Sequence, residues 1–286
     1  MGDVEQAQPV SPQRGTCATC GASEETTPMT YVYGIGTVQP RFPRVSVEKE
    51  FAQVVGRGDT SGLTDRQTLQ TVLSKRENRY LARQLCWVMT IEGLETYIVV
   101  PRDPGDYDVL IQTLRAAPKP GDLDVVVGVR GPTAQPDMCN GLMIPIVAFD
   151  QIYSFDRDTL IDSIPRPKDL SEKEKKNFAT TSGELFDRIL QIADNAGATD
   201  EHRALNYLAV RYPAIYAKAL EEFGRANSLT AVDVRPSALS NVRRLVDVIF
   251  SFTNRTTDVT DKYACRVDVS EEFPFLASKL SSYYDR

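Results

Sequence analysis

Four cysteines are the residues of this chain whose type and spacing most directly predict chemistry. Cys17 and Cys20 are separated by two residues and followed by Gly21, a spacing whose tight turn brings two thiolates onto one zinc ion, each at about 2.3 Å. A structural zinc site needs two further ligands, and Cys86 and Cys139 are of the right type to supply them. The sequence therefore predicts a closed, structural zinc site made by Cys17, Cys20, Cys86 and Cys139.

A second interpretation of the cysteines stays open. Cys86 is then a small buried hydrophobic residue, Cys139 a loop thiol, and the Cys17–Cys20 segment part of an unbound arm, because the intervals between these cysteines match no standard zinc finger. Cys265, within an apolar run, is predicted to lie in the core. Since the sequence begins without a secretory signal, free thiols or metal ligands are favoured over a framework of disulfides.

Catalytic motifs are absent from the sequence. The chain contains one histidine, His202, on a predicted helix, and no nucleophile motif accompanies it. The GxSxG, HExxH, Walker and GxGxxG patterns do not occur. Gly34 and Gly36 lack the third glycine and the following helix that a nucleotide-binding loop requires. Asp122 and Asp124 have the chemistry to hold a cation or transfer protons, but their place where a turn begins favours solvated caps.

Composition and charge are those of an ordinary globular protein, with 286 residues, 42% of them hydrophobic and 25% charged. A formal charge of −6 argues against a nucleic-acid partner, because nucleic-acid binders concentrate positive charge. Two small basic clusters, Arg76 with Arg79 and Arg83, and Arg243 with Arg244, have the chemistry to hold a peptide carboxylate, although surface ion pairs are the simpler explanation.

A membrane or secreted protein is not expected from this sequence. No apolar run reaches the roughly 18–20 residues that span a bilayer, and the first residues lack the apolar core of a signal peptide. We therefore expect a cytoplasmic protein with no membrane partner.

A central hairpin is predicted at Gln84–Pro101, where two apolar runs flank Glu92 and Gly93. Both faces of the two strands are apolar, which is typical of central strands covered on two sides. A two-residue turn fixes the expected register, which pairs Ile91 with Leu94, Met89 with Thr96, Trp87 with Ile98 and Cys86 with Val99. The hairpin is thus expected to be a core element that positions Cys86.

The chain is predicted to consist of an arm and one domain. Residues 1–29 carry the CxxC pair without hydrophobic periodicity and are predicted to be a flexible arm. Residues 30–286 are predicted to form a single α+β domain of two lobes, 30–157 and 158–286. The fold expected is a mostly antiparallel sheet with a helical block inserted between strand regions. Those strands are predicted at 31–38, in the hairpin 84–101, and at 122–129, 142–155, 229–234, 245–253 and 263–269.

Helix starts are predicted from capping residues. Ser46 is expected to cap a first helix, Thr64 and Gln67 form a capping-box pattern, and Thr199 or Asp200 is expected to cap the helix that carries His202. The last residues, 271–286, are predicted to be a short amphipathic helix.

The chain resembles a known family over Tyr31 to Arg286. The runs that carry the resemblance include YVYGIGTVQPRFP, NRYLARQLCWVMTIEGLETYI, MCNGLMIPIVAFDQIYSF, ATDEHRALNYLAVRYPAIY and RVDVSEEFPFL. They are similar to the C-terminal domain of the cyanobactin maturation proteases, the PatA/PatG family of the patellamide-type pathways. The resemblance implies that the domain, one of unknown function, follows a subtilisin-like protease or macrocyclase domain. This sequence holds no counterpart of the subtilisin triad, so no catalytic residue is carried over.

The function that the resemblance implies is that of a non-catalytic accessory domain in the cutting and cyclising of ribosomally made peptides. It would act by homodimerisation or by binding the precursor peptide or a pathway enzyme. Apolar residues of the helical block, such as Leu205, Leu208, Ile215 and Tyr216, are either core or such an interface. The alternative is an enzyme that modifies peptides with the loop 130–141 and His202. The sequence leaves enzyme activity open and favours a domain without it.

Overall fold

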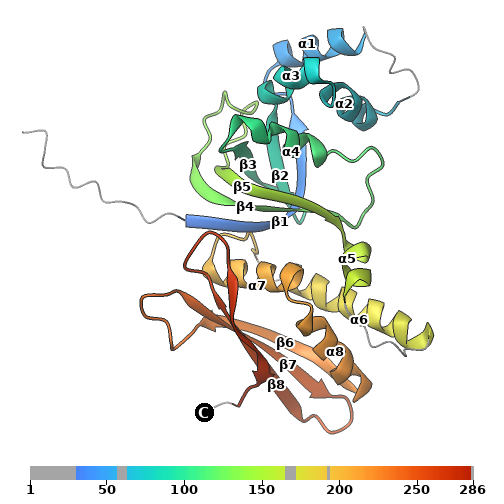
Figure 1. The fold of residues 1–286 in the computed structure, drawn as a ribbon, viewed down its shortest axis with the longest axis vertical. Coiled ribbons are helices and arrows are strands. Elements are labelled where there is room, and N and C mark those ends of the chain that lie inside the picture. The colour runs from blue at the N-terminus through green and yellow to red at the C-terminus, as the bar shows by residue number, and fades with distance from the viewer. Residues whose placement is uncertain (1–29, 57–62, 165–171, 192–193, 285–286) are drawn as a thin grey trace, which may run out of the picture.

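The computed structural model describes residues 30–56, 63–164, 172–191 and 194–284, and Figure 1 shows their arrangement. The predicted fold class is confirmed, because the protein is α+β with mostly antiparallel sheets and a helical block separates the strands of a barrel from those of a second sheet. The predicted arm 1–29, with Cys17 and Cys20, lies outside the described residues.

The first sheet closes into a barrel with the strand order β1-β2-β3-β5-β4. Its strands are β1 (Thr30–Arg41), β2 (Cys86–Ile91), β3 (Leu94–Pro101), β4 (Asp122–Thr133) and β5 (Pro145–Asp156). All neighbours are antiparallel except β3 and β5. Gly36 lets β1 approach β2 closely, because a Cβ there would lie 2.3 Å from the carbonyl oxygen of Thr90. Strand packing, without a nucleotide, accounts for this glycine.

Short helices pack on the barrel and share its core (Figure 1). They are α1 (Val45–Val55), α2 (Asp65–Leu73), α3 (Arg79–Gln84) and α4 (Tyr107–Gln112). The capping box of α2 is confirmed, since the Gln67 N–H donates to Thr64 Oγ1 and the Thr64 N–H donates to the Gln67 side chain. The predicted Ser46 cap is wrong: Arg44, extended directly after Pro43, is the N-cap of α1, so Ser46 falls inside the first turn.

The register of the β2–β3 hairpin agrees with the prediction at the turn and departs from it beyond. Glu92 and Gly93 have positive φ angles of 49° and 81°, as a type I′ turn requires, and Ile91 pairs with Leu94. A bulge then shifts the pairing by one residue. The observed pairs are Met89 with Tyr97 and Trp87 with Val99. The prediction was wrong there because a sequence that is apolar on both faces carries no sign of the extra residue.

The helical block packs against the second, C-terminal sheet. The helices are α5 (Arg157–Ser163), α6 (Glu172–Leu190), α7 (Asp200–Arg211) and α8 (Ala214–Gly224). The strands of the sheet, in spatial order, are β6 (Asn227–Pro236), β7 (Leu245–Asn254), β8 (Thr260–Asp268) and β9 (Phe275–Ser282). Each strand is antiparallel to its neighbour. Leu205, Leu208, Ile215 and Tyr216 are buried in the core between helices and sheet. These apolar residues are therefore core and not a partner interface.

Phe275–Ser282 form the strand β9, and the amphipathic helix predicted over 271–286 is wrong. β9 pairs with β8, and Leu276 and Leu280 pack against the same core as the helices. A separation of four residues places two side chains on one face of a strand as well as of a helix. The backbone groups of β8 supply hydrogen-bond partners that decide in favour of the strand.

Helix α7 lies between the barrel and the C-terminal sheet (Figure 1). The loop before it contacts β1, where the Tyr33 N–H donates to the carbonyl of Gly197 over 2.9 Å. The Asn206 side chain on α7 donates to the carbonyl of Tyr33 over 2.7 Å, and the Tyr97 hydroxyl donates to the carbonyl of Ala196 over 2.9 Å. Because Asn206 is 1% exposed, its bond is shielded from water and helps fix α7 on the outer barrel wall.

Candidate functional site

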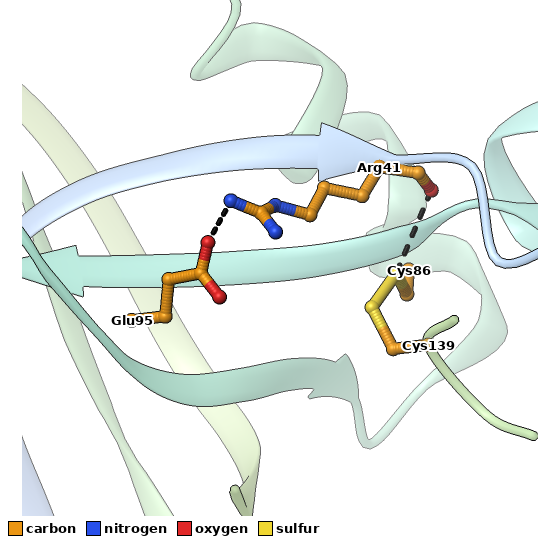
Figure 2. Close-up of a disulfide and its surroundings, with 4 residues drawn as sticks. All are labelled: Arg41, Cys86, Glu95 and Cys139. Atoms are coloured by element: carbon orange, nitrogen blue, oxygen red, sulfur yellow. Dashed lines mark hydrogen bonds and ion pairs between the residues drawn. A yellow bond between two sulfur atoms is a disulfide. The ribbon is translucent and has the colours of Figure 1, made fainter. Parts of the chain in front are cut away.

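A disulfide joins the barrel wall to the loop between β4 and β5 (Figure 2). Cys86 is the first residue of β2, and Cys139 lies in the loop 134–144. Both are buried, and their Cα atoms are 5.7 Å apart. We call the outer barrel wall at this bond the disulfide face. It consists of Cys86, Val88, Ile98, Ala134 and Cys139, with Val100, Leu142, Ile144 and Ile146 packed around them.

The loop 134–144 folds back as a cover over this face. The Ala134 N–H donates to the carbonyl of Ile144 over 2.9 Å, and the Leu142 N–H donates to the carbonyl of Cys139 over 3.0 Å. Val88 and Ile98 are 1% exposed beneath the cover. The hairpin is thus apolar and covered on both faces, as its sequence predicts. The disulfide holds the cover on strands whose outer side chains would otherwise meet water.

The surroundings of Cys86 also suit a reduced thiol. Its sulfur lies 3.5 Å from the carbonyl oxygen of Arg41, a contact in which a thiol is a donor, whereas a disulfide sulfur carries no hydrogen to donate. The Arg41 side chain forms an ion pair with Glu95 of β3 beside it (Figure 2). The same environment therefore accommodates Cys86 either as half of a disulfide or as a thiol that donates a hydrogen bond to the carbonyl oxygen of Arg41.

The predicted zinc ligands divide between described and undescribed residues. Cys86 and Cys139 are adjacent, but their sulfurs are bonded to each other, which differs from the expectation of free thiols or metal ligands. Their separation of 53 residues hides this proximity in the sequence. In the ranges that the structure describes, no group of three or more His, Cys, Asp or Glu side chains is arranged to hold a metal. The zinc site of Cys17, Cys20, Cys86 and Cys139 stays a prediction, which requires the disulfide to be reduced.

Thiol counting together with metal analysis tests the zinc prediction. If Cys86 and Cys139 are bonded and the other cysteines are free, denatured protein prepared without reductant will show three free thiols from its five cysteines. The zinc-bound form will show five after chelation. In native protein Cys265 is expected to stay unreactive, because burial raises the pKa of its thiol to about 12. One zinc per chain with five thiols supports the four-cysteine site, and five thiols without zinc contradict it.

A cavity of about 760 Å³ opens beside the disulfide. Its walls come from β2 and β3, the start of α1, the end of α3, the end of β4 and the loop that follows β4. Apolar side chains make up much of the lining, among them Val47, Leu85, Val100, Tyr107, Met138 and Ile146. A concave, largely apolar site of this size is typical of ligand pockets.

Three charged side chains line this cavity, and none has an ion-pair partner among the described residues. They are Arg44, Arg83 and Asp137, all exposed. The neighbouring Arg79, in contrast, pairs with Asp108 over 2.7 Å. The sequence singles out Arg83 as part of a basic cluster suited to a carboxylate, but it gives no sign of Arg44, because a lone arginine beside a proline follows no pattern.

His202 does not meet the loop 130–141 in this cavity. It lies in the first turn of α7, where its backbone N–H donates to Thr199 Oγ1 over 3.1 Å, which confirms Thr199 as the cap. No residue of α7 lines the cavity. The His202 Nδ1 is buried without a hydrogen-bond partner in the described part of the chain, and burial lowers the pKa of the imidazole. This arrangement gives no support to the enzyme hypothesis, which needs the histidine beside the reacting group.

Asp122 and Asp124 are buried and are not the predicted solvated caps. Asp124 is 1% exposed; its carboxylate accepts from the Val38 N–H over 2.8 Å and from the Ser154 hydroxyl over 2.5 Å, and Arg115 lies 3.3 Å away. Burial raises the pKa of Asp124, and these partners oppose the rise. The carboxylate ties β1, β4 and β5 together, and the sequence could not show this because two of its partners lie 30 and 86 residues away.

The fold and the cavity define an α+β protein with a candidate ligand site on the wall of a small barrel. Within the described residues, no helix has the length and apolar character needed to cross a membrane. None of the curated proteins matches the chain.

The comparisons with known families and structures find similarity to the same kind of domain. The family described as PatG C-terminal matches residues 172–283, which extend from the start of α6 through the whole of β9. A solved structure described as "PatG Domain of Unknown Function" has a TM-score of 0.70 at 19% identity, covering 89% of this chain and 98% of that chain; at this identity the likeness shows the fold. The two findings confirm the resemblance to the PatG C-terminal domain of unknown function.

Proposed function

We propose that the chain is a non-catalytic accessory domain of a cyanobactin maturation protein, and that it binds a precursor peptide or a pathway enzyme in the cavity beside the disulfide. The observation that carries the proposal is this cavity, with apolar walls and three charged side chains that have no ion-pair partner among the described residues. Polar groups without partners beside an apolar recess are what a ligand needs for orientation and affinity. The similarity to a PatG domain supplies the context.

A matched pair of tryptophan variants tests this proposal. Gln135 is exposed and lines the cavity, whereas Gln53 on α1 is exposed and does not. Gln135→Trp is expected to occupy the cavity and weaken binding of the precursor peptide or a pathway enzyme by at least about tenfold, the equivalent of one good contact. Gln53→Trp should bind like the unaltered chain. Titration calorimetry with the precursor peptide and with each pathway enzyme measures the effect; binding that is equal in all three proteins, or absent from all, would contradict the proposal.

Two further features belong to this proposal. A homodimer stays a prediction, although the apolar helical residues that suggested it are core; sedimentation velocity on concentrated protein measures it, and a monomer at every concentration would contradict it. A cytoplasmic location is likewise proposed. Thiols are kept reduced in that compartment, so Cys86 and Cys139 would there be available as thiolates for zinc together with Cys17 and Cys20.

A further inference from the structure

We propose that the ligand of the cavity beside the disulfide is the C-terminal end of a peptide, held by its free carboxylate and by an apolar last side chain. This inference rests on the proposed function and goes beyond it, because it names the part of the ligand and the groups that recognise it. Three observations carry it, namely the two arginines without an ion pair to a described residue, the apolar walls next to them, and the one acidic residue that lines the cavity in the described part of the chain.

Two arginines that line the cavity indicate an anionic ligand. Arg44 and Arg83 come from the start of α1 and the end of α3, and both line the same cavity without an ion pair to any described residue. A guanidinium binds a carboxylate through two parallel hydrogen bonds, which is among the strongest polar contacts available to a protein. In a chain with a formal charge of −6, two arginines beside one recess, neither paired with a carboxylate of the described residues, are a local exception to the overall charge.

The apolar lining selects a carboxylate that has a hydrophobic group beside it. Pro43 and Val47 flank Arg44 in the lining, and Leu85 lies close to Arg83 in the chain and in the cavity. A C-terminal residue carries its carboxylate and its side chain on the same Cα, so both can enter one cavity together. An Asp or Glu within a peptide would supply only the carboxylate, so a neighbouring residue would have to make the apolar contact. The peptide chain would also have to enter the cavity and leave it again on the other side of that residue.

Asp137 limits the charge of the ligand. It lines the cavity from the loop that Cys139 fastens to the barrel, so the charged lining residues that the structure describes, two arginines and one aspartate, sum to +1. This charge matches a carboxylate better than a phosphate, which carries up to two negative charges. Asp137→Asn is therefore expected to tighten the binding of a carboxylate, the opposite of the effect of removing an arginine.

Synthetic peptides test the inference directly. The probe is an N-acetylated hexapeptide, Ser-Gly-Ser-Val-Leu-Phe, with a free C-terminal carboxylate; the comparison is the same peptide as its C-terminal amide. The acid is expected to bind at least about tenfold more tightly than the amide, because the amide loses the charge-assisted bonds. Arg83→Gln should remove most of this difference. Arg76→Gln is the matched control, since Arg76 is an exposed arginine a few residues before Arg83 that does not line the cavity.

The outcomes separate this inference from the proposed function. Equal binding of acid and amide, or no binding of either, overturns the assignment to a C-terminal carboxylate. If an amidated peptide with an internal aspartate binds as tightly as the acid, the carboxylate comes from a side chain and the inference also fails. In each case the proposed function stands if Gln135→Trp still weakens the binding of the precursor or of a pathway enzyme. Selective binding of the acid that Arg83→Gln abolishes and Arg76→Gln leaves intact supports the inference.

Discussion

Reducing the Cys86–Cys139 bond is expected to lower the free energy of unfolding by about 4 kcal/mol. The bond closes a loop between residues 53 apart in the sequence, and closing a loop of this length removes roughly that much conformational freedom from the unfolded chain. Locally, the disulfide face should loosen most, because the loop 134–144 would lose its covalent link and its backbone bonds at Ala134 and Leu142 would open more often. Urea unfolding of protein whose disulfide has been verified by mass, with and without reductant and with a chelator in both samples, measures it.

A double variant provides the control for this measurement. Cys86→Ser with Cys139→Ser should be as unstable as the reduced protein, and reductant should change its unfolding midpoint no further. Hydrogen exchange should show faster exchange of the Ala134 and Leu142 amides in both, with a smaller increase for amides of β7 (Leu245–Asn254). Equal midpoints for oxidised and reduced protein would show that the disulfide contributes no stability, and the loop would then be held by its apolar contacts alone.

The parts of the fold that the sequence predicted correctly are those determined by neighbouring residues. The turn at Glu92-Gly93, the Thr64–Gln67 capping box and the Thr199 cap each depend on two to four consecutive residues, so the pattern and the structure coincide. The apolar character of both hairpin faces correctly predicted strands covered on two sides.

The features that the sequence missed depend on contacts between distant residues. Asp124 resembles a strand-start cap until β1 and β5 close around it. The spacing of Leu276 and Leu280 fits a helix until β8 offers its backbone groups. Cys139 comes within bonding distance of Cys86 only because β4 and β5 bring the loop back to β2 and β3. In the candidate site, too, a local pattern is visible in the sequence and a distant contact is not. Arg83 belongs to a basic cluster that the sequence shows, whereas Arg44 reaches the cavity only through the packing of α1.

Replacing Arg203 by methionine is expected to cost about 3 kcal/mol of stability, because it leaves one buried and two partly buried hydrogen-bond acceptors without their donor. Arg203 on α7 is 1% exposed, and burial lowers its pKa to about 10. Its guanidinium donates to the carbonyl of Val269 over 2.8 Å and to the carbonyls of Glu271 and Glu272. The guanidinium also lies 5.2 Å from the centre of the Tyr31 ring of β1. One side chain thus connects α7, the barrel and the segment that leads to β9.

The segment after Val269 has a second link to the barrel, which decides how far the damage should spread. Arg102 pairs with Glu272 over 3.2 Å and with Asp150 of β5 over 3.1 Å. The Arg102–Glu272 pair is partly exposed and contributes less than about 1 kcal/mol. It should therefore not hold the segment once the Arg203 guanidinium is removed. Amides of residues 269–272 are therefore expected to exchange faster in Arg203→Met, ahead of those in the barrel.

Arg188 offers the matched control for Arg203. It is exposed and donates to the carbonyl of Thr230 over 2.7 Å. Arg188→Met should cost no more than about 1 kcal/mol, because water can replace the lost donor. Arg203→Lys should fall between the two, since an ammonium keeps the charge but cannot reproduce the planar set of donors. Urea unfolding of the three variants measures the order. If Arg203→Met unfolded at the same midpoint as Arg188→Met, the contacts of α7 with β1 at Tyr33 and Asn206 would be sufficient to hold the barrel and the C-terminal sheet together.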